Sequence, residues 1–163
     1  MVSTKLLKEN PLFGGLSDDG LEKILEICSE KEYKEGETIF SKGDKAEELF
    51  ILYDGECEVK VALGGTLEYY TVYRLSPGEV FGEMGFIDRS ERSATVRCAK
   101  NAKVLVLKRT DFDKLAERSP EIVATIMSNM ATILARRLRE TDAELRNFYF
   151  KSTVSFRKIF GSK

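Results

Sequence analysis

Histidine is absent from this chain of 163 residues. Without histidine the chain cannot build a Ser-His-Asp or Cys-His nucleophile pair, and it cannot bind a metal ion through imidazole. It also lacks a paired-carboxylate pattern of the kind that general acid–base catalysis uses. These absences exclude the commonest hydrolytic and metal-dependent chemistries, so we expect no catalytic activity, no metal site and no cofactor.

Cysteine is scarce as well, with only Cys28, Cys57 and Cys98. The three residues are far apart and form no CxxC pair, so they indicate neither a disulfide framework nor a metal cluster. Each lies in an apolar segment, which predicts reduced, buried thiols in a cytoplasmic protein.

The chain also lacks a long apolar run and an excess of either charge. No stretch approaches the roughly 18 consecutive apolar residues of a membrane-spanning helix, and residues 1–15 contain no apolar leader segment. Lys plus Arg total 26 against 27 Asp plus Glu, which leaves a net charge of −1. We therefore expect a cytoplasmic protein that associates with neither membranes nor nucleic acid.

The residues that are present suit a soluble globular domain, with 42% hydrophobic and 33% charged residues. An N-terminal helix is predicted behind Ser17, whose hydroxyl suits an N-cap. Between residues 30 and 109 the pattern changes to short β-rich runs separated by glycine turns, including a hairpin at Gly64-Gly65. The predicted strands are 30–34, 37–41, 48–53, 56–63, 67–75, 79–81, 93–98 and 103–108.

Helical spacing returns at Thr110, a predicted N-cap, and Ser119-Pro120 marks a break before a long helix over about 120–148. This long helix carries two apolar stripes. The heptad stripe comprises Ala124, Met127, Ala131, Leu134, Leu138, Thr141, Leu145 and Phe148. The second stripe comprises Val123, Ile126, Met130 and Ile133. Two stripes favour a helix that packs on its own domain and also pairs with a second copy in a homodimer. A single wide stripe facing the core is the alternative.

The segment GEVFGEMGFIDRSERSATVR, residues 78–97, combines residue types that suit a nucleotide with one phosphate. A short helical turn between two strands has unpaired N–H groups at its start, which can hold a phosphate. Arg92 can supply a bidentate counter-charge to that phosphate. The carboxylate of Glu83 is suited to accept hydrogen bonds from a sugar hydroxyl. A surface ion pair between Glu83 and Arg92 is the alternative explanation of these two residues alone.

The pattern FGE-x8-R-S-A-T, which starts at Phe81, resembles the phosphate-binding cassette of cyclic nucleotide-binding domains. These domains occur in bacterial catabolite activators, kinase regulatory subunits and cyclic-nucleotide-gated channels. Glycines at the expected turn positions support the resemblance, which covers roughly residues 12–147; they are Gly36, Gly43, Gly55 and Gly78. The resemblance implies a mainly β fold with flanking helices, namely a jelly-roll-like β-roll (a double-stranded β-helix) of about eight strands.

The resemblance also implies roles for individual residues. Glu83 would hold the ribose 2′-hydroxyl and Arg92 the cyclic phosphate. The other residues implied at this end of the site are Gly82, Met84, Gly85, Ser93 and Ala94. Because Glu83 and Arg92 fall on a predicted loop, we expect that replacing either one weakens binding and leaves the fold intact.

Thr141 follows the sequence ARRLRE, at the place where catabolite activators carry a threonine that contacts the adenine base. By resemblance Thr141 would reach the purine, and the alternative is a tolerated polar residue in the heptad stripe. Asp142 departs from the serine usual at the next position. We expect cyclic AMP as the preferred ligand and cyclic GMP as possible, with Tyr73 and Arg74 as further candidates to touch the base.

The predicted organisation has three parts: a β-roll with its first helices at 1–118, the long helix at 119–148, and a basic aromatic tail at 149–163. From Arg146 onward the chain has five basic residues and no acidic one, so residues 1–145 carry a net charge of −6. The tail could fold back on the body, dock an acidic partner or, as the weakest alternative, lie on an anionic membrane.

The predicted function is a cyclic nucleotide sensor that moves its C-terminal helix for an unidentified protein partner. Because only about twenty residues follow the long helix, a helix-turn-helix domain would not fit. The chain would be a stand-alone sensor or a fragment, with the stand-alone form favoured. The alternatives are an interaction module with a degenerate or different-effector pocket, and a transcription regulator fragment without its DNA-binding domain.

Overall fold

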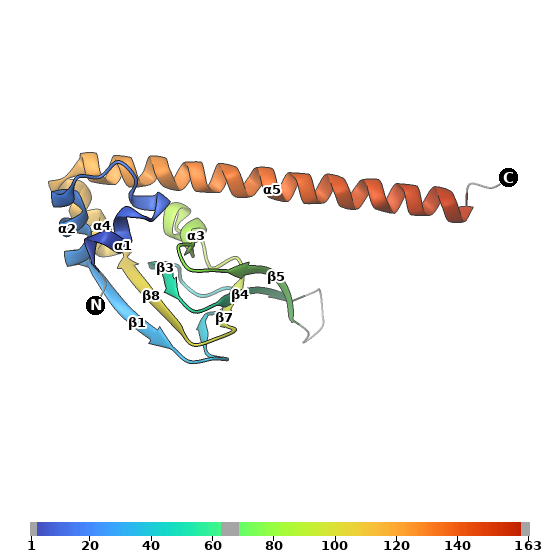
Figure 1. The fold of residues 1–163 in the computed structure, drawn as a ribbon, viewed down its shortest axis with the longest axis horizontal. Coiled ribbons are helices and arrows are strands. Elements are labelled where there is room, and N and C mark those ends of the chain that lie inside the picture. The colour runs from blue at the N-terminus through green and yellow to red at the C-terminus, as the bar shows by residue number, and fades with distance from the viewer. Residues whose placement is uncertain (1–2, 63–68, 161–163) are drawn as a thin grey trace.

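The computed structural model describes residues 3–62 and 69–160, with the side chains of residues 152–160 left out (Figure 1). The predicted Gly64-Gly65 hairpin lies outside the described residues. The N-terminal part contains α1 (Thr4–Lys8), a 3₁₀ turn η1 (Pro11–Phe13) and α2 (Asp18–Ile27). Ser17 is the N-cap of α2, as predicted, and its hydroxyl accepts a hydrogen bond from the Gly20 N–H at 3.2 Å.

Eight strands follow and form two four-stranded antiparallel sheets. Sheet A has the order β1-β8-β3-β6, with β1 (Cys28–Tyr33), β8 (Ala102–Lys108), β3 (Glu48–Asp54) and β6 (Val80–Phe81). Sheet B has the order β2-β7-β4-β5, with β2 (Thr38–Phe40), β7 (Thr95–Cys98), β4 (Cys57–Ala62) and β5 (Tyr69–Leu75). The predicted β-roll of eight strands with flanking helices is thus confirmed.

The central strands of sheet A are apolar on both faces, and their alternation creates two cores. In β3, Leu49 and Ile51 point to the helices, whereas Phe50 and Leu52 point between the sheets. Strand β8 alternates in the same way and pairs with β3 in antiparallel register. A core of the helical layer therefore lies on one face of sheet A, and the core of the β-roll lies on the other.

The helical layer is completed by α3 (Glu83–Asp88), α4 (Arg109–Arg118) and α5 (Pro120–Phe160). The predicted N-cap at Thr110 is wrong, because β8 passes directly into α4 and Lys108 is the cap. The break at Ser119 is confirmed, with φ −146° and ψ 65° between the two helices. Helix α5 continues past residue 148 to Phe160, so its backbone includes most of the predicted tail. Within residues 3–62 and 69–160, no helix is both long and apolar enough to cross a membrane.

One apolar face of α5 packs on the body, and it is the face that carries the second stripe. Ile126 and Met130 are fully buried and Ile133 is 8% exposed, all within the helical core. Each fully buried side chain of this size contributes about 1.5–3 kcal/mol to docking the helix. Leu138 and Leu145, in the distal part of the heptad stripe, are 63% and 50% exposed. The apolar residues of α5 therefore cover two faces, and only one is buried by its own domain.

The three cysteines carry free thiols. Cys57 and Cys98 are buried as predicted, with their Sγ atoms 3.8 Å apart across β4 and β7, whereas Cys28 is only half-buried at the start of β1. Burial raises the pKa of the Cys28 and Cys57 thiols to about 12, so neither forms a thiolate at neutral pH.

We predict that Gly55→Ala lowers the free energy of unfolding by about 3 kcal/mol. Gly55 has φ +90°, and a Cβ there would collide with the Asn101 carbonyl oxygen and lie 2.8 Å from the Ala102 Cα. Gly78→Ala is the matched control, since Gly78 has φ +92° with no atom within 4 Å of its Cβ position. Backbone strain alone should lower the free energy of unfolding of that control by about 1 kcal/mol. If urea unfolding showed the same loss of unfolding free energy in both variants, that result would contradict the close approach at Gly55.

Candidate functional site

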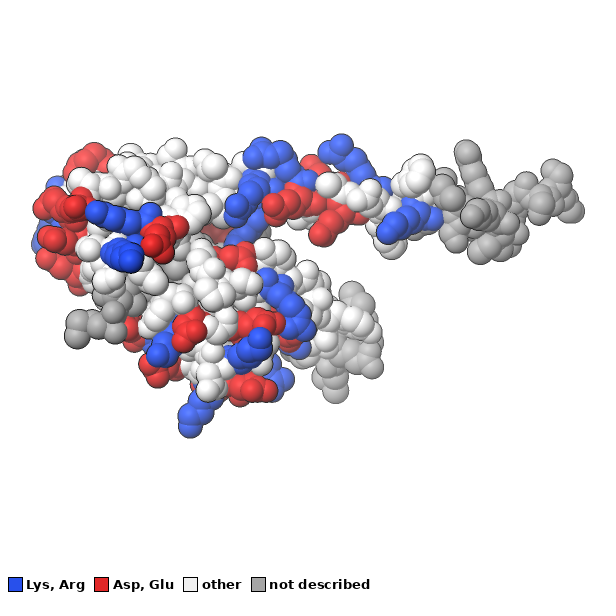
Figure 2. Space-filling view, in the orientation of Figure 1, with Lys and Arg blue, Asp and Glu red and all other residues white. Residues whose placement is uncertain are grey.

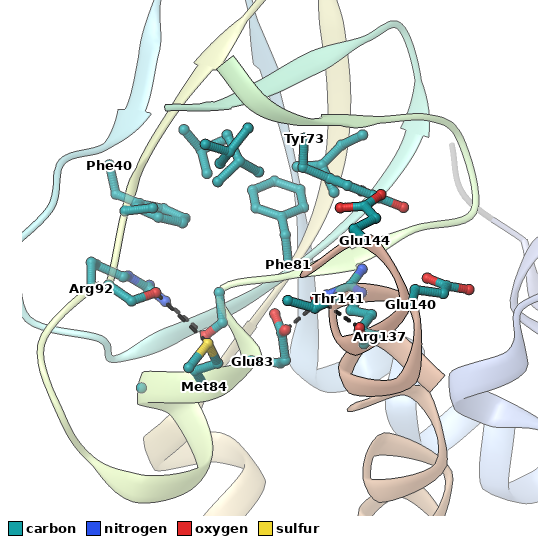
Figure 3. Close-up of a pocket in the computed structure, with 18 residues that line it drawn as sticks. Phe40, Tyr73, Phe81, Glu83, Met84, Arg92, Arg137, Glu140, Thr141 and Glu144 are labelled. Atoms are coloured by element: carbon teal, nitrogen blue, oxygen red, sulfur yellow. Dashed lines mark hydrogen bonds and ion pairs between the residues drawn. The ribbon is translucent and has the colours of Figure 1, made fainter. Parts of the chain in front are cut away.

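A pocket of about 470 Å³ lies between sheet B, α3 and the middle of α5 (Figure 3). Its walls combine apolar side chains of the β-roll with polar side chains of the two helices. All eight residues predicted for the site line this one pocket: Gly82, Glu83, Met84, Gly85, Arg92, Ser93, Ala94 and Thr141. Tertiary structure thus brings Thr141 to the same place as the 82–94 segment, and the role of each residue in ligand contact stays a prediction.

Arg92 is a buried cation held by backbone carbonyl groups. Its Nη1 donates to the Gly82 carbonyl at 2.9 Å and its Nη2 to the Glu48 carbonyl at 2.7 Å. The guanidinium carbon lies 4.2 Å from the centre of the Phe40 ring, a cation–π contact. Arg92 lies on a loop, as predicted, but only 5% of the residue is exposed, and its contacts give it a part in holding the fold.

Within the described residues no carboxylate lies at ion-pair distance from the Arg92 guanidinium, although the charges of Glu48, Asp44 and Glu83 act on it from farther away. None of the ion pairs within the described residues includes Arg92, so the surface pair with Glu83 considered above does not form. Its Nε is a buried side-chain nitrogen without a hydrogen-bond partner in that part of the chain. Burial lowers the pKa of the guanidinium, but arginine stays charged at neutral pH. An anion beside it would therefore gain a charge-assisted contact.

The turn before α3 brings backbone N–H groups to the same end of the pocket. Gly82 has φ 75°, and a Cβ there would lie 2.6 Å from Arg92 Nη1, so only glycine fits between the strand and the guanidinium. The first N–H groups of a helix have no intrahelical acceptor. The Ser93 hydroxyl, also at this end, has a weak partner in Met84 Sδ at 3.7 Å. The Arg92 cation, the backbone N–H groups and the Ser93 hydroxyl together form an environment suited to a phosphate.

Glu83 is also buried, with 6% exposed, and its partner is Arg137 of α5. Arg137 Nη1 donates to Glu83 Oε1 at 2.8 Å, and Arg137 Nη2 donates to the Val80 carbonyl at 2.6 Å. Sequence reasoning missed Arg137. It could have been found from its position four residues before Thr141, because that spacing places both side chains on one face of a helix.

The third part of the pocket is an apolar slot between sheet B and α5. It is lined by Phe40, Val59, Val72, Tyr73, Leu75, Phe81 and Val96, and α5 closes it with Thr141. The Thr141 hydroxyl donates to the Arg137 carbonyl at 2.9 Å. Of the two further candidates, Tyr73 lines the slot, whereas Arg74 pairs with Glu56 and Glu58 at 2.6 Å and does not line the pocket. A flat aromatic base fits such a slot.

The comparisons with known proteins agree with this geometry. The model of the cyclic nucleotide-binding domain matches residues 30–119. The cyclic AMP receptor protein of Thermus thermophilus is 36% identical over 140 residues, which are 85% of this chain and 62% of that protein. The regulatory subunit of a cAMP-dependent protein kinase from Mycosarcoma maydis is 32% identical over 84% of this chain and 25% of its own length. The chain thus spans less than two thirds of either relative.

Solved structures show the same fold. The catabolite activator protein of Thermus thermophilus superimposes with a TM-score of 0.74 and 35% identity, covering 86% of this chain and 64% of that one. A cyclic nucleotide-binding domain from Methylobacillus flagellatus superimposes with a TM-score of 0.79 at 20% identity, over 88% of this chain and 80% of that one, which shows the fold alone. On the family match, the fold and the identity to these relatives, the chain belongs to the cyclic nucleotide-binding domain family.

Proposed function

We propose that this chain binds cyclic AMP in the pocket beside α3 and transmits its occupancy through α5 as a non-catalytic sensor. The observation that carries the proposal is Arg92, a buried guanidinium that forms no ion pair within the described residues and lies at the end of a pocket of nucleotide size. The cyclic phosphate would lie against Arg92, the first N–H groups of α3 and the Ser93 hydroxyl. These groups are already held in place, so binding requires little ordering of the protein.

The ribose would lie between the phosphate end and the base slot, next to Glu83. Glu83 is an acceptor-only group, and Arg137 occupies its Oε1. A 2′-hydroxyl can donate to the same carboxylate without displacing Arg137, because each carboxylate has about four lone-pair sites. The contact would join ligand, α3 and α5 in one hydrogen-bonded chain.

Binding of the ligand can also affect the positions of α4 and α5 by a second route, through α3. Phe86 of α3 is fully buried in the helical core, and its ring centre lies 5.4 Å from that of Phe112 in α4. Arg109 of α4 donates to the Phe86 carbonyl and pairs with Asp113 at 2.8 Å. A displacement of α3 would therefore move α4, and the joint at Ser119 would allow α5 to follow. The ligand can shift this equilibrium only by its differential affinity for the two arrangements.

We also propose that α5 forms a homodimer through the heptad stripe. Figure 2 shows the exposed part of α5 extending beyond the body, with charged side chains beside uncharged ones. Leu138 and Leu145 lie on this part and are half or more exposed. Pairing with a second α5 would bury both, in the heptad geometry of a coiled coil. A downstream protein would then contact the pair, and the free thiols are consistent with a cytoplasmic setting.

Arg92→Lys should weaken cyclic AMP binding by at least tenfold, because lysine keeps the charge but loses the forked contact, worth on the order of 2 kcal/mol. Calorimetric titration measures the affinity, at a temperature below the melting transition of each variant. Arg89→Asn is the control: it removes an exposed guanidinium from the same segment, and asparagine tolerates its φ of 62°. Equal affinities of wild type and Arg92→Lys would refute the assignment of the phosphate end.

The role of Glu83 is tested with 2′-deoxy cyclic AMP. The wild type should bind this analogue about tenfold more weakly than cyclic AMP, since a hydrogen bond to a charged group is lost. In Glu83→Ala the two ligands should bind alike, whereas Glu91→Ala, which removes an exposed carboxylate from the same segment, should keep the difference. A tenfold preference that survives in Glu83→Ala would place the ribose elsewhere.

The dimer is tested by a pair of glutamate substitutions on opposite faces of α5. Leu138→Glu puts a charge into the heptad stripe and should yield particles of 18.5 kDa, whereas Ala143→Glu lies off the stripe and should leave the mass at twice that value. Light scattering after size-exclusion chromatography measures both masses. A monomeric wild type, or dissociation by both substitutions alike, would count against pairing through this stripe.

A further inference from the structure

Four side chains of α5 line the pocket, and three of them lie at consecutive turns, namely Arg137, Thr141 and Glu144. Their spacing of four and then three residues places them on one helix face. Figure 3 shows Glu144 beside Tyr73, at the end of the pocket away from Arg92. Glu144 therefore lies at the slot that the proposed function gives to the base, one turn beyond Thr141.

The two hydroxyl donors at this end of the pocket are already committed. The Thr141 hydroxyl donates to the Arg137 carbonyl, and the Tyr73 hydroxyl donates to Glu79 at 2.6 Å. Arg137 uses one N–H of each terminal nitrogen for Glu83 and the Val80 carbonyl. Thr141 and Glu144 offer a base acceptor capacity, through the hydroxyl lone pairs and the carboxylate.

Glu140 is the other carboxylate at this end, and its geometry differs. It lies 3.9 Å from Arg136 in an ion pair along the helix. Its charge also acts on the Tyr73 hydroxyl. The two carboxylates thus have the same charge and line the same pocket, and Glu144 is the one that has no ion pair within the described residues and is left to contact a base.

Adenine differs from guanine and hypoxanthine in the substituent at position 6 of the purine ring. Adenine carries an amino group there, which donates hydrogen bonds, whereas guanine and hypoxanthine carry an oxo group, which only accepts. A carboxylate beside position 6 gains a hydrogen bond from the amino group and is repelled by the oxo group, so it discriminates by attraction and repulsion together.

We propose that Glu144 is a specificity residue that accepts a hydrogen bond from the purine 6-amino group and disfavours 6-oxo purines. This inference rests on the proposed function, because it requires the cyclic nucleotide to occupy the pocket with its base in the slot. The residue that selects the base would then lie on α5, the helix that also transmits ligand occupancy. A ligand with the wrong base would therefore contact α5 less well.

The test compares three cyclic nucleotides whose substituents at position 6 differ: cyclic AMP with its amino group, cyclic IMP with an oxo group and a protonated N1, and cyclic purine riboside monophosphate with hydrogen. Wild type should prefer cyclic AMP to the 6-hydrogen analogue by about tenfold, as one hydrogen bond to a charged group predicts. Cyclic IMP should bind more weakly still. Calorimetric titration of the full chain gives all three affinities.

Glu144→Ala should reduce the preference for cyclic AMP over the 6-hydrogen analogue to less than threefold, with the affinity for the analogue unchanged. Glu144→Lys supplies a donor and should shift the preference toward cyclic IMP. Glu121→Ala is the matched control, since it removes the same charge from an exposed position of the same helix outside the pocket and should keep the wild-type ratio. Alanine is the best helix former, so α5 should persist in both alanine variants, as circular dichroism can check.

An unchanged ratio in Glu144→Ala overturns the inference and leaves the proposed function intact. An equal change in Glu144→Ala and Glu121→Ala also overturns it, because the effect would then be one of general charge. Failure of the wild type to bind any of the three nucleotides overturns the proposed function together with the inference.

Discussion

The burial of Arg92 without an ion pair in the described part of the chain is the constraint on which the site depends. Removing a guanidinium from water is costly, and here the cost is offset by two carbonyl groups and the Phe40 ring. Those contacts fix where the 82–92 segment can run. Gly82 must lack a side chain because Arg92 Nη1 fills the space a Cβ would need. The spacing of the FGE-x8-R pattern thus has a steric origin as well as a chemical one.

The same contacts explain why the site and the stability of the fold are linked. A residue that only bound ligand could be removed without disturbing the protein, whereas Arg92 joins the segment before α3 to the carbonyl group of Glu48 on β3. Glu83 is tied to α5 in a comparable way through Arg137. Binding groups that are also structural groups are held rigidly, which favours affinity through preorganisation.

Helix α5 serves as a wall of the pocket and as an element with a second, exposed apolar face. One of its sides buries Ile126 and Met130 in the helical core, and another carries the exposed Leu138 and Leu145. Arg137 and Thr141 connect it to the pocket between these two surfaces. Since the α4–α5 joint at Ser119 is a single residue, a shift of the helix relative to the β-roll needs only a local change of backbone angles.

Local pattern was enough to predict the strands, the break at Ser119 and the N-cap at Ser17, and the resemblance to cyclic nucleotide-binding domains implied the eight residues that meet at the pocket. Period-2 alternation, turn glycines and the FGE-x8-R-S-A-T spacing are short-range signals that survive without an alignment. The start of α4 was misplaced because β8 continues into it without a loop, and α5 was predicted too short because the heptad stripe stops at Phe148 while the helix continues to Phe160.

Tertiary structure alone determined that Glu83 and Arg92 are buried and which groups they contact. The sequence places Glu83 and Arg92 nine residues apart in one segment, and from that distance an ion pair on an exposed loop is the simplest expectation. The fold instead buries both and gives each a partner far along the chain, Arg137 for Glu83 and the Glu48 carbonyl for Arg92. Sequence determines which residues carry the right chemistry, whereas long-range packing determines which of them meet, because those contacts join elements that local periodicity cannot place relative to one another.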